Sequence, residues 1–130
     1  MAALKLRAVV VIDDEATVRT MAGAILARAG FDVHVADSGQ AAMALLRQLG
    51  ARVAIVLLDW TLPDVAGPNM LADVQRVVPK AHVIVSTGLD RDDAALSPAK
   101  AARVSFLEKP YTAAALIDAV RSRIDAEEQA

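Results

Sequence analysis

The chain contains no cysteine among its 130 residues. It therefore has neither a disulfide framework nor a thiolate for catalysis, a composition that suits a reducing compartment. Neither sign of charge dominates, because 14 basic residues face 16 acidic ones and the net charge is −2. This balance lacks the basic surface that nucleic acids or anionic membranes attract. We therefore expect no nucleic-acid partner within this chain.

Long hydrophobic runs are also missing, although 55% of the residues are hydrophobic. No apolar stretch approaches the roughly 20 residues that span a bilayer. The segment 1–7 is too short, and charged too early, for a secretory signal. The sequence thus predicts a cytoplasmic protein with no membrane insertion.

No internal repeat, low-complexity tract or linker divides the chain. A length of 130 residues suits a single domain with its own hydrophobic core. We expect one domain over residues 1–130, with a core of about 7–126 and an acidic tail at the end, residues 127–130.

Short β-branched runs alternate with longer stretches in which apolar residues recur every three or four positions. This alternation predicts five βα units, and hence a parallel sheet with helices on both faces. The expected strands are 7–12, 32–35, 53–58, 82–86 and 104–107.

The fourth of the expected helices is interrupted by a proline. Residues 90–103 have the length of a helix, but Pro98 removes a backbone donor and biases Ser97 away from helical geometry. Either Ser97 caps a short second piece that begins at Pro98, or the first half is irregular. We expect this helix to be short, bent or mobile.

Polar residues follow four of the expected strands. Asp13 and Asp14 follow the first strand, Asp59 the third, Thr87 the fourth and Lys109 the fifth. In an open parallel sheet, ligands bind outside the carboxyl ends of the strands. Each residue alone has an ordinary structural explanation, such as capping a turn or facing solvent. Their combined placement predicts a shared site.

Carboxylates that lie close together raise each other's pKa unless a cation compensates them. Mg²⁺ fits three such carboxylates best, because it accepts few protein ligands and retains waters. Asp59 would be a carboxylate nucleophile, Lys109 would balance phosphoryl charge, and the Thr87 hydroxyl would donate to the product. The residues therefore predict phosphorylation of Asp59.

Four segments together resemble the receiver domain of two-component response regulators, over nearly the whole chain from about Arg7 to Ile124. The resemblance implies a flavodoxin-like (βα)5 fold with strand order 2-1-3-4-5. It also implies a stand-alone receiver or the receiver of a hybrid histidine kinase. The matching segments are 10–15, 57–63, 85–88 and 106–110.

By this resemblance, Asp59 would accept a phosphoryl group from a histidine kinase or a phosphotransfer protein. Asp13, Asp14, Asp59 and the backbone carbonyl of Thr61 would bind Mg²⁺. Lys109 would contact the phosphoryl group. The protein would then be a signalling switch, and not an enzyme beyond its own phosphorylation and dephosphorylation.

The resemblance also assigns roles around this site. Thr87 would move toward the phosphoryl group, and Phe106 would report the movement on the face formed by the fourth helix, fifth strand and last helix. Phe106 lacks a tyrosine hydroxyl, so it would switch by packing alone. Leu89 cannot orient an attacking water, so dephosphorylation should be slow. The residue after Asp59, Trp60, is expected to face the surface.

Two other functions remain open at this point. One is a phosphohydrolase with Asp59 as nucleophile, as in phosphatases of the haloacid dehalogenase type. Those enzymes place a second aspartate two residues later, where this chain has Thr61, and no insertion is long enough for a substrate cap. The other is a degenerate receiver that only binds protein. The downstream partner is not indicated by the sequence.

Overall fold

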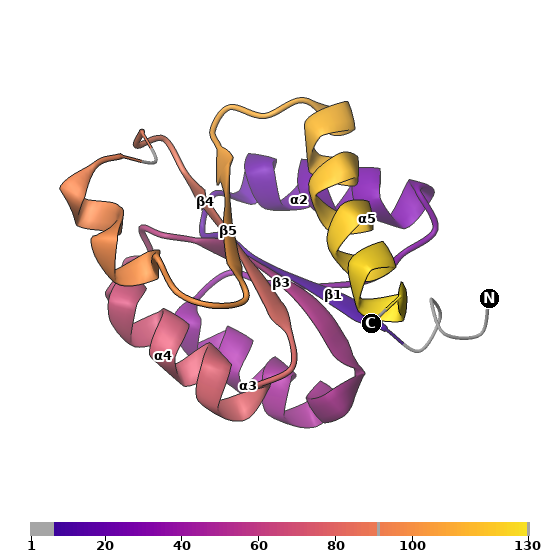
Figure 1. Ribbon diagram of the computed structural model, residues 1–130, viewed down its shortest axis with the longest axis horizontal. Helices are drawn as coiled ribbons and strands as arrows, with labels where there is room; N and C mark the ends of the chain where they lie inside the picture. Colours follow the sequence, from indigo (N-terminus) through magenta and orange to yellow (C-terminus); the bar gives the residue numbers. More distant parts are fainter. Residues whose placement is uncertain (1–6, 91, 130) are drawn as a thin grey trace.

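Five parallel strands form one twisted sheet in the order β2-β1-β3-β4-β5 (Figure 1). This is a computed structural model, and it describes residues 7–90 and 92–129, with side chains as far as residue 124. The predicted fold class and strand order are confirmed. The strands are β1 Ala8–Ile12, β2 Asp32–Ala36, β3 Val53–Asp59, β4 His82–Thr87 and β5 Val104–Glu108.

Helices cover both faces of the sheet (Figure 1). On one face lie α2, Ala16–Arg28, and α5, Ala113–Gln129; on the other lie α3, Gly39–Leu49, and α4, Gly67–Val77. A short 3-10 turn, η1 Gly50–Arg52, joins α3 to β3. Because α5 runs to Gln129, most of the expected acidic tail continues the helix. No helix in the described part of the chain is long and apolar enough to cross a membrane.

The central strands alternate between two hydrophobic clusters. In β1, Val10 and Ile12 pack toward α3 and α4, whereas Val9 and Val11 pack toward α2 and α5. All five residues of β1 are buried, as is usual for a parallel strand covered on both faces. The sheet is therefore a rigid support for whatever lies at its carboxyl edge.

Among the described residues between β4 and β5, the helical element is one 3-10 helix, η2 Ala94–Ala99, with Pro98 inside it. Asp93 caps it, because the Asp93 Oδ1 atom accepts a hydrogen bond from the amide of Ala95 at 2.9 Å. The expectation of a short fourth helix is confirmed. The suggested cap at Ser97 is wrong, since the helical turn begins before it. Leu96 is fully buried and fastens η2 to the core.

The expectation that Trp60 faces the surface is wrong, because the side chain is only 7% exposed. The amide of Trp60 donates to the carbonyl of Ser86 at 3.0 Å, which continues the ladder between β3 and β4. The strand alternation therefore persists past Asp59 and turns Trp60 into the same cluster as Leu58.

Gly67 makes room for this indole ring. A Cβ atom at Gly67 would lie 2.6 Å from Cδ2 of Trp60 and 2.8 Å from its carbonyl oxygen. Alanine normally favours a helix over glycine, yet here we expect Gly67→Ala to lower the free energy of unfolding by about 2 kcal/mol through overpacking. Urea denaturation measures this. Gly88→Ala is the control, because no atom lies within 4 Å of its added Cβ; equal losses in both variants would contradict the prediction.

Candidate functional site

Strand register brings the first two acidic segments together. Ile12 of β1 lies beside Leu58 of β3, so Asp13 and Asp59, the next residue of each segment, are neighbours at the carboxyl edge. The amide of Asp13 donates to the carbonyl of Ala36 at 3.2 Å, which also fixes its position relative to β2. The predicted convergence of these two carboxylates is thus present in the fold.

Asp13, Asp14 and Asp59 form an acidic cluster in which one oxygen of each carboxylate lies within 4.8 Å of the others. Asp13 and Asp59 are 3% and 6% exposed, whereas Asp14 faces solvent. Hard carboxylate oxygens with an open side suit a divalent cation that keeps several waters. The donor set therefore fits Mg²⁺.

Lys109 closes the cluster from β5. The Lys109 Nζ atom lies 2.9 Å from Oδ2 of Asp13, 3.5 Å from Oδ1 of Asp59 and 3.9 Å from Oε1 of Glu15. Burial alone would lower the pKa of Lys109, but the hydrogen bond to Asp13 and the charge of Asp59 raise it above the usual range. Lys109 therefore remains a cation at the site. The peptide bond that follows it, to Pro110, is cis.

The pKa of Asp59 is raised from 3.8 to about 7, chiefly because burial removes the carboxylate from water. The charge of Asp13 raises this pKa further, while the amide of Thr61 and the charge of Lys109 lower it. One lysine is not enough to offset the burial and the neighbouring acid. Without a bound cation, the Asp59 carboxyl group is therefore partly protonated near neutral pH.

The remaining predicted residues surround this cluster. The amide of Thr61 donates to Oδ1 of Asp59 at 3.1 Å. Thr87 is 6% exposed, and its Oγ1 accepts a hydrogen bond from the amide of Leu89 at 3.1 Å. Phe106 is half-buried and lines, with Thr87 and Leu89, a cavity of about 260 Å³.

Two residues near the site were not predicted. The Asp64 carboxylate accepts hydrogen bonds from two backbone amides of α3. Tyr111 lines a depression together with Lys109, beside the acidic cluster at the carboxyl edge of the sheet, which we call the acidic rim. Burial raises the pKa of Tyr111, and the charge of Asp13 adds to this effect. An aspartate directly after Pro63 was the available signal for a turn that reaches a neighbouring helix.

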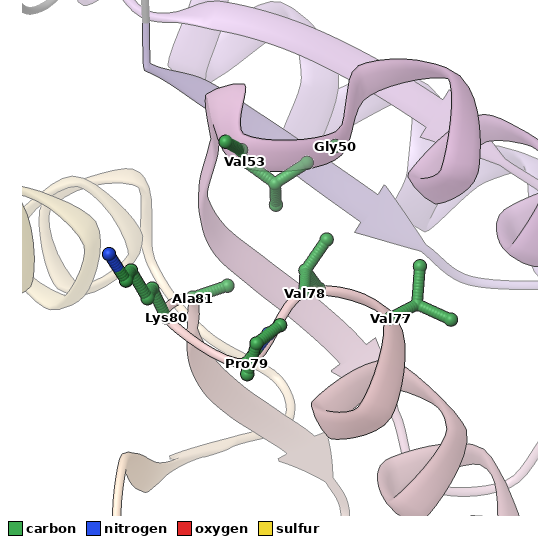
Figure 2. A pocket seen from close by; sticks show the side chains of 8 residues that line it. Gly50, Val53, Val77, Val78, Pro79, Lys80 and Ala81 are labelled. Atoms are coloured by element: carbon green, nitrogen blue, oxygen red, sulfur yellow. The ribbon is translucent and has the colours of Figure 1, made fainter.

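A separate apolar pocket lies at the amino ends of the strands, away from the acidic cluster (Figure 2). It measures about 240 Å³, and Lys80 is the one ionisable residue in its lining. The side chains of Val53, Val77 and Val78 surround it (Figure 2). Apart from the amino group of Lys80, the lining of this pocket offers no group for acid–base, metal or phosphoryl chemistry, so the carboxyl edge remains the candidate site.

The fold and the acidic rim together define an α/β domain of the doubly wound type, with its chemistry at the carboxyl ends of the strands. A family model described as "Response regulator receiver domain" matches residues 9–121. The chain therefore belongs to the family of response regulator receiver domains. Receiver domains bind Mg²⁺ at an acidic pocket and pair with histidine kinases or phosphotransfer proteins.

Individual relatives agree with this assignment. The chain is 30% identical over 117 residues to the sensor kinase CckA of Brucella abortus, covering 90% of this chain but 12% of the kinase. It is 26% identical over 113 residues to the chemotaxis protein CheY of Thermotoga maritima, covering 86% of this chain and 92% of CheY. A receiver domain structure from Clostridium thermocellum superposes with a TM-score of 0.81 at 26% identity, covering 95% and 98% of the two chains.

Proposed function

We propose that this protein is a phosphorylation-dependent switch in which Asp59 accepts a phosphoryl group from a phosphohistidine on a histidine kinase or phosphotransfer protein. The observation that carries the proposal is the buried Asp59 carboxylate with Lys109 Nζ at 3.5 Å and two further aspartates around it. In the transfer, a P–O bond to Asp59 forms while the P–N bond breaks, and the bonding electrons leave with the imidazole nitrogen.

Asp13, Asp14, Asp59 and the backbone carbonyl of Thr61 would hold Mg²⁺. The bound ion would supply positive charge that offsets the carboxylates and the incoming phosphoryl oxygens. Lys109 would then turn from Asp13 toward the phosphoryl group on Asp59, because its Nζ atom lies 2.9 Å from the Asp13 carboxylate and 3.5 Å from that of Asp59. The phosphoryl group would thus compete with Asp13 for Lys109, the partly buried lysine of the described site.

The output would begin at Thr87 and end at Phe106. Both line the same cavity of about 260 Å³, which gives the half-buried Phe106 ring room to move when the Thr87 hydroxyl turns toward a phosphoryl oxygen. Phe106 belongs to β5, the edge strand of the sheet, and this strand lies between the η2 segment and α5 (Figure 1). The face formed by η2, β5 and α5 would therefore carry the signal.

The phosphodonor would approach from the side of α2. A depression of about 320 Å³ beside Lys109 is lined by Val18 and Met21 of α2 and by Pro110 and Tyr111 after β5. Met21 is 48% exposed, which is unusual for a large apolar side chain. An apolar surface next to the acceptor suits a partner protein that must place its histidine within bonding distance of Asp59.

Dephosphorylation is expected to be slow. Leu89 is 37% exposed near the site, and its apolar side chain cannot orient a water for attack on the phosphoryl group. Placing glutamate there, Leu89→Glu, should shorten the half-life of the phosphorylated protein, because a carboxylate can accept a proton from that water. Phosphoprotein gels after removal of acetyl phosphate measure the decay. A half-life of only seconds in the unmodified protein would contradict the expectation.

Beryllofluoride with Mg²⁺ tests the proposal directly, because it imitates a phosphoryl group on an aspartate. A saturable change in the fluorescence of Trp60, the single tryptophan, is expected on addition of both reagents. Hydrolysis of phosphate esters at a catalytic rate would instead indicate a phosphohydrolase. The absence of any response would indicate a domain that only binds protein.

A further inference from the structure

We propose that Asp64 is a positioning residue of the Mg²⁺ site, which holds the loop that carries Thr61 in place against the start of α3. This inference deepens the proposed function and rests on it, because it concerns the loop whose backbone carbonyl would bind the ion. Asp64 itself lies outside the acidic cluster and would not touch the ion. It would act through the loop between β3 and α4.

The start of α3 binds the Asp64 carboxylate with two backbone amides. The amide of Gly39 donates to Oδ1 of Asp64 and the amide of Gln40 donates to Oδ2, each at 3.0 Å. The next amide, that of Ala41, donates to the Oγ atom of Ser38 at 3.1 Å. The first amides of a helix have no partner within the helix, so Asp64 supplies acceptors that the local sequence of α3 does not provide.

The carboxylate is held strongly as an anion in this position. The hydrogen bonds from Gly39 and Gln40 lower the pKa of Asp64 below its usual value. A helix amino terminus also carries a partial positive charge that favours an anion. The contact therefore persists throughout the neutral pH range.

A second, independent feature shows that the loop packs closely on α3. A Cβ atom added to Gly39 would lie 2.5 Å from Cγ2 of Val65, the residue after Asp64. A side chain larger than hydrogen would fit there only if the side chains of Val65 and Asp64 shifted. The absence of a side chain at Gly39 therefore leaves the space that Asp64 and Val65 occupy.

The loop transmits this attachment to the site because it is closed on itself. Thr61 and Ala66 form an isolated antiparallel bridge, so the two ends of the loop are paired. The amide of Thr61 also donates to Oδ1 of Asp59 at 3.1 Å. With its base paired and its tip bound to α3, the loop has little freedom to move the Thr61 carbonyl.

The start of α3 is in turn fixed to the other half of the site. The amide of Asp13 donates to the carbonyl of Ala36, which lies three residues before Gly39. Asp64 thus links the Thr61 side of the cluster, through α3, to the Asp13 side. Removing the Asp64 carboxylate should make the distance between Asp13, after β1, and the Thr61 carbonyl, after β3, more variable.

Titration with Mg²⁺ tests the inference, with Trp60 fluorescence or calorimetry as the readout. Asp64→Ala is expected to raise the dissociation constant for Mg²⁺ about tenfold, the effect typical of lost support behind metal ligands. Asp64→Asn keeps one acceptor oxygen and should restore part of the affinity. Gly39→Ala should weaken binding too, because its Cβ would lie 2.5 Å from Cγ2 of Val65 and 3.3 Å from Oδ1 of Asp64, and would therefore displace both residues.

Ser38→Ala is the matched control, since it removes a cap of the same helix but leaves the loop untouched. It should lower stability in urea while the Mg²⁺ affinity stays unchanged. Equal Mg²⁺ affinity in Asp64→Ala and the unmodified protein would overturn this inference alone. Failure of the unmodified protein to bind Mg²⁺ would overturn the proposed function and the inference together. Amide exchange of Thr61, measured without metal, should be faster in Asp64→Ala; unchanged exchange would also overturn the inference.

Discussion

An Asp59→Asn protein is expected to show no fluorescence response to beryllofluoride with Mg²⁺ and no labelling by acetyl phosphate. Asparagine keeps the shape of the side chain but has no anionic oxygen to attack phosphorus or to bind beryllium. Asp13 is buried beside the same lysine, but among the described carboxylates of the acidic cluster only that of Asp59 also accepts a hydrogen bond from the amide of Thr61. We expect complete loss of the response. Stopped-flow fluorescence and phosphoprotein gels measure it.

Asp73→Asn is a suitable control for this experiment. Asp73 lies on α4 and pairs with Arg76 at 3.2 Å, with 42% of its side chain exposed. It is therefore an aspartate that lies on a helix surface, outside the acidic cluster. Labelling that persists in Asp59→Asn but disappears in another rim variant would move the acceptor elsewhere and contradict the proposal.

The Asp59→Asn substitution is also expected to stabilise the metal-free protein at alkaline pH. The pKa of Asp59 is about 7 in the folded state and 3.8 in the unfolded chain. The folded protein thus binds this proton more tightly. The resulting stability is fully present below pH 3.8 and is lost as pH rises through about 7. Because solvent on the exposed Asp14 side of the cluster screens part of this effect, we expect a loss of about 2 kcal/mol.

Urea unfolding at pH 5 to 8 without metal measures this effect. The free energy of unfolding of the unmodified protein should fall over that range, whereas Asp59→Asn should show a flatter dependence and be more stable at pH 8. Mg²⁺ should restore stability to the unmodified protein only, because its charge offsets the ionised cluster. Parallel pH profiles for the two proteins would contradict the prediction.

The position of the acidic rim could be predicted because it follows from the sheet. Asp13 and Asp59 each follow a buried β-branched run, and parallel strands bring such ends together. Lys109 was predictable for the same reason, at the end of β5. Which strands are neighbours came from the family resemblance, since the local pattern of residues does not determine the order of strands.

The burial of Trp60 could not be predicted from local pattern. It depends on one further ladder hydrogen bond, to Ser86, and on the absence of a side chain at Gly67. Ser86 is distant from Trp60 in sequence. Gly67 belongs to α4, and its contact with Trp60 depends on how α4 packs against the sheet. The segment 60–63, which ends in Pro63, suggested a loop directly after Asp59, whereas the tertiary structure continues the strand alternation by one residue.

The contact of Asp64 with α3 illustrates a second limit. The residues that it joins are 25 and 24 positions apart, so no window of local sequence contains both. Pro98 shows the opposite case. A proline acts on its own turn, so the loss of a regular helix before β5 was predictable, although the start of η2 at Ala94 was not.

The pairing of Gly39 with Asp64 and Val65 has a consequence for chimeric proteins. The connection after β2 and the connection after β3 contact each other as one interlocked unit. Exchanging either connection alone with that of another receiver would bring together a helix start and a loop that were never fitted to each other. Grafts that transfer residues 36–40 and 61–66 together should keep a working rim, and grafts of one segment should produce a folded domain with misplaced ligands.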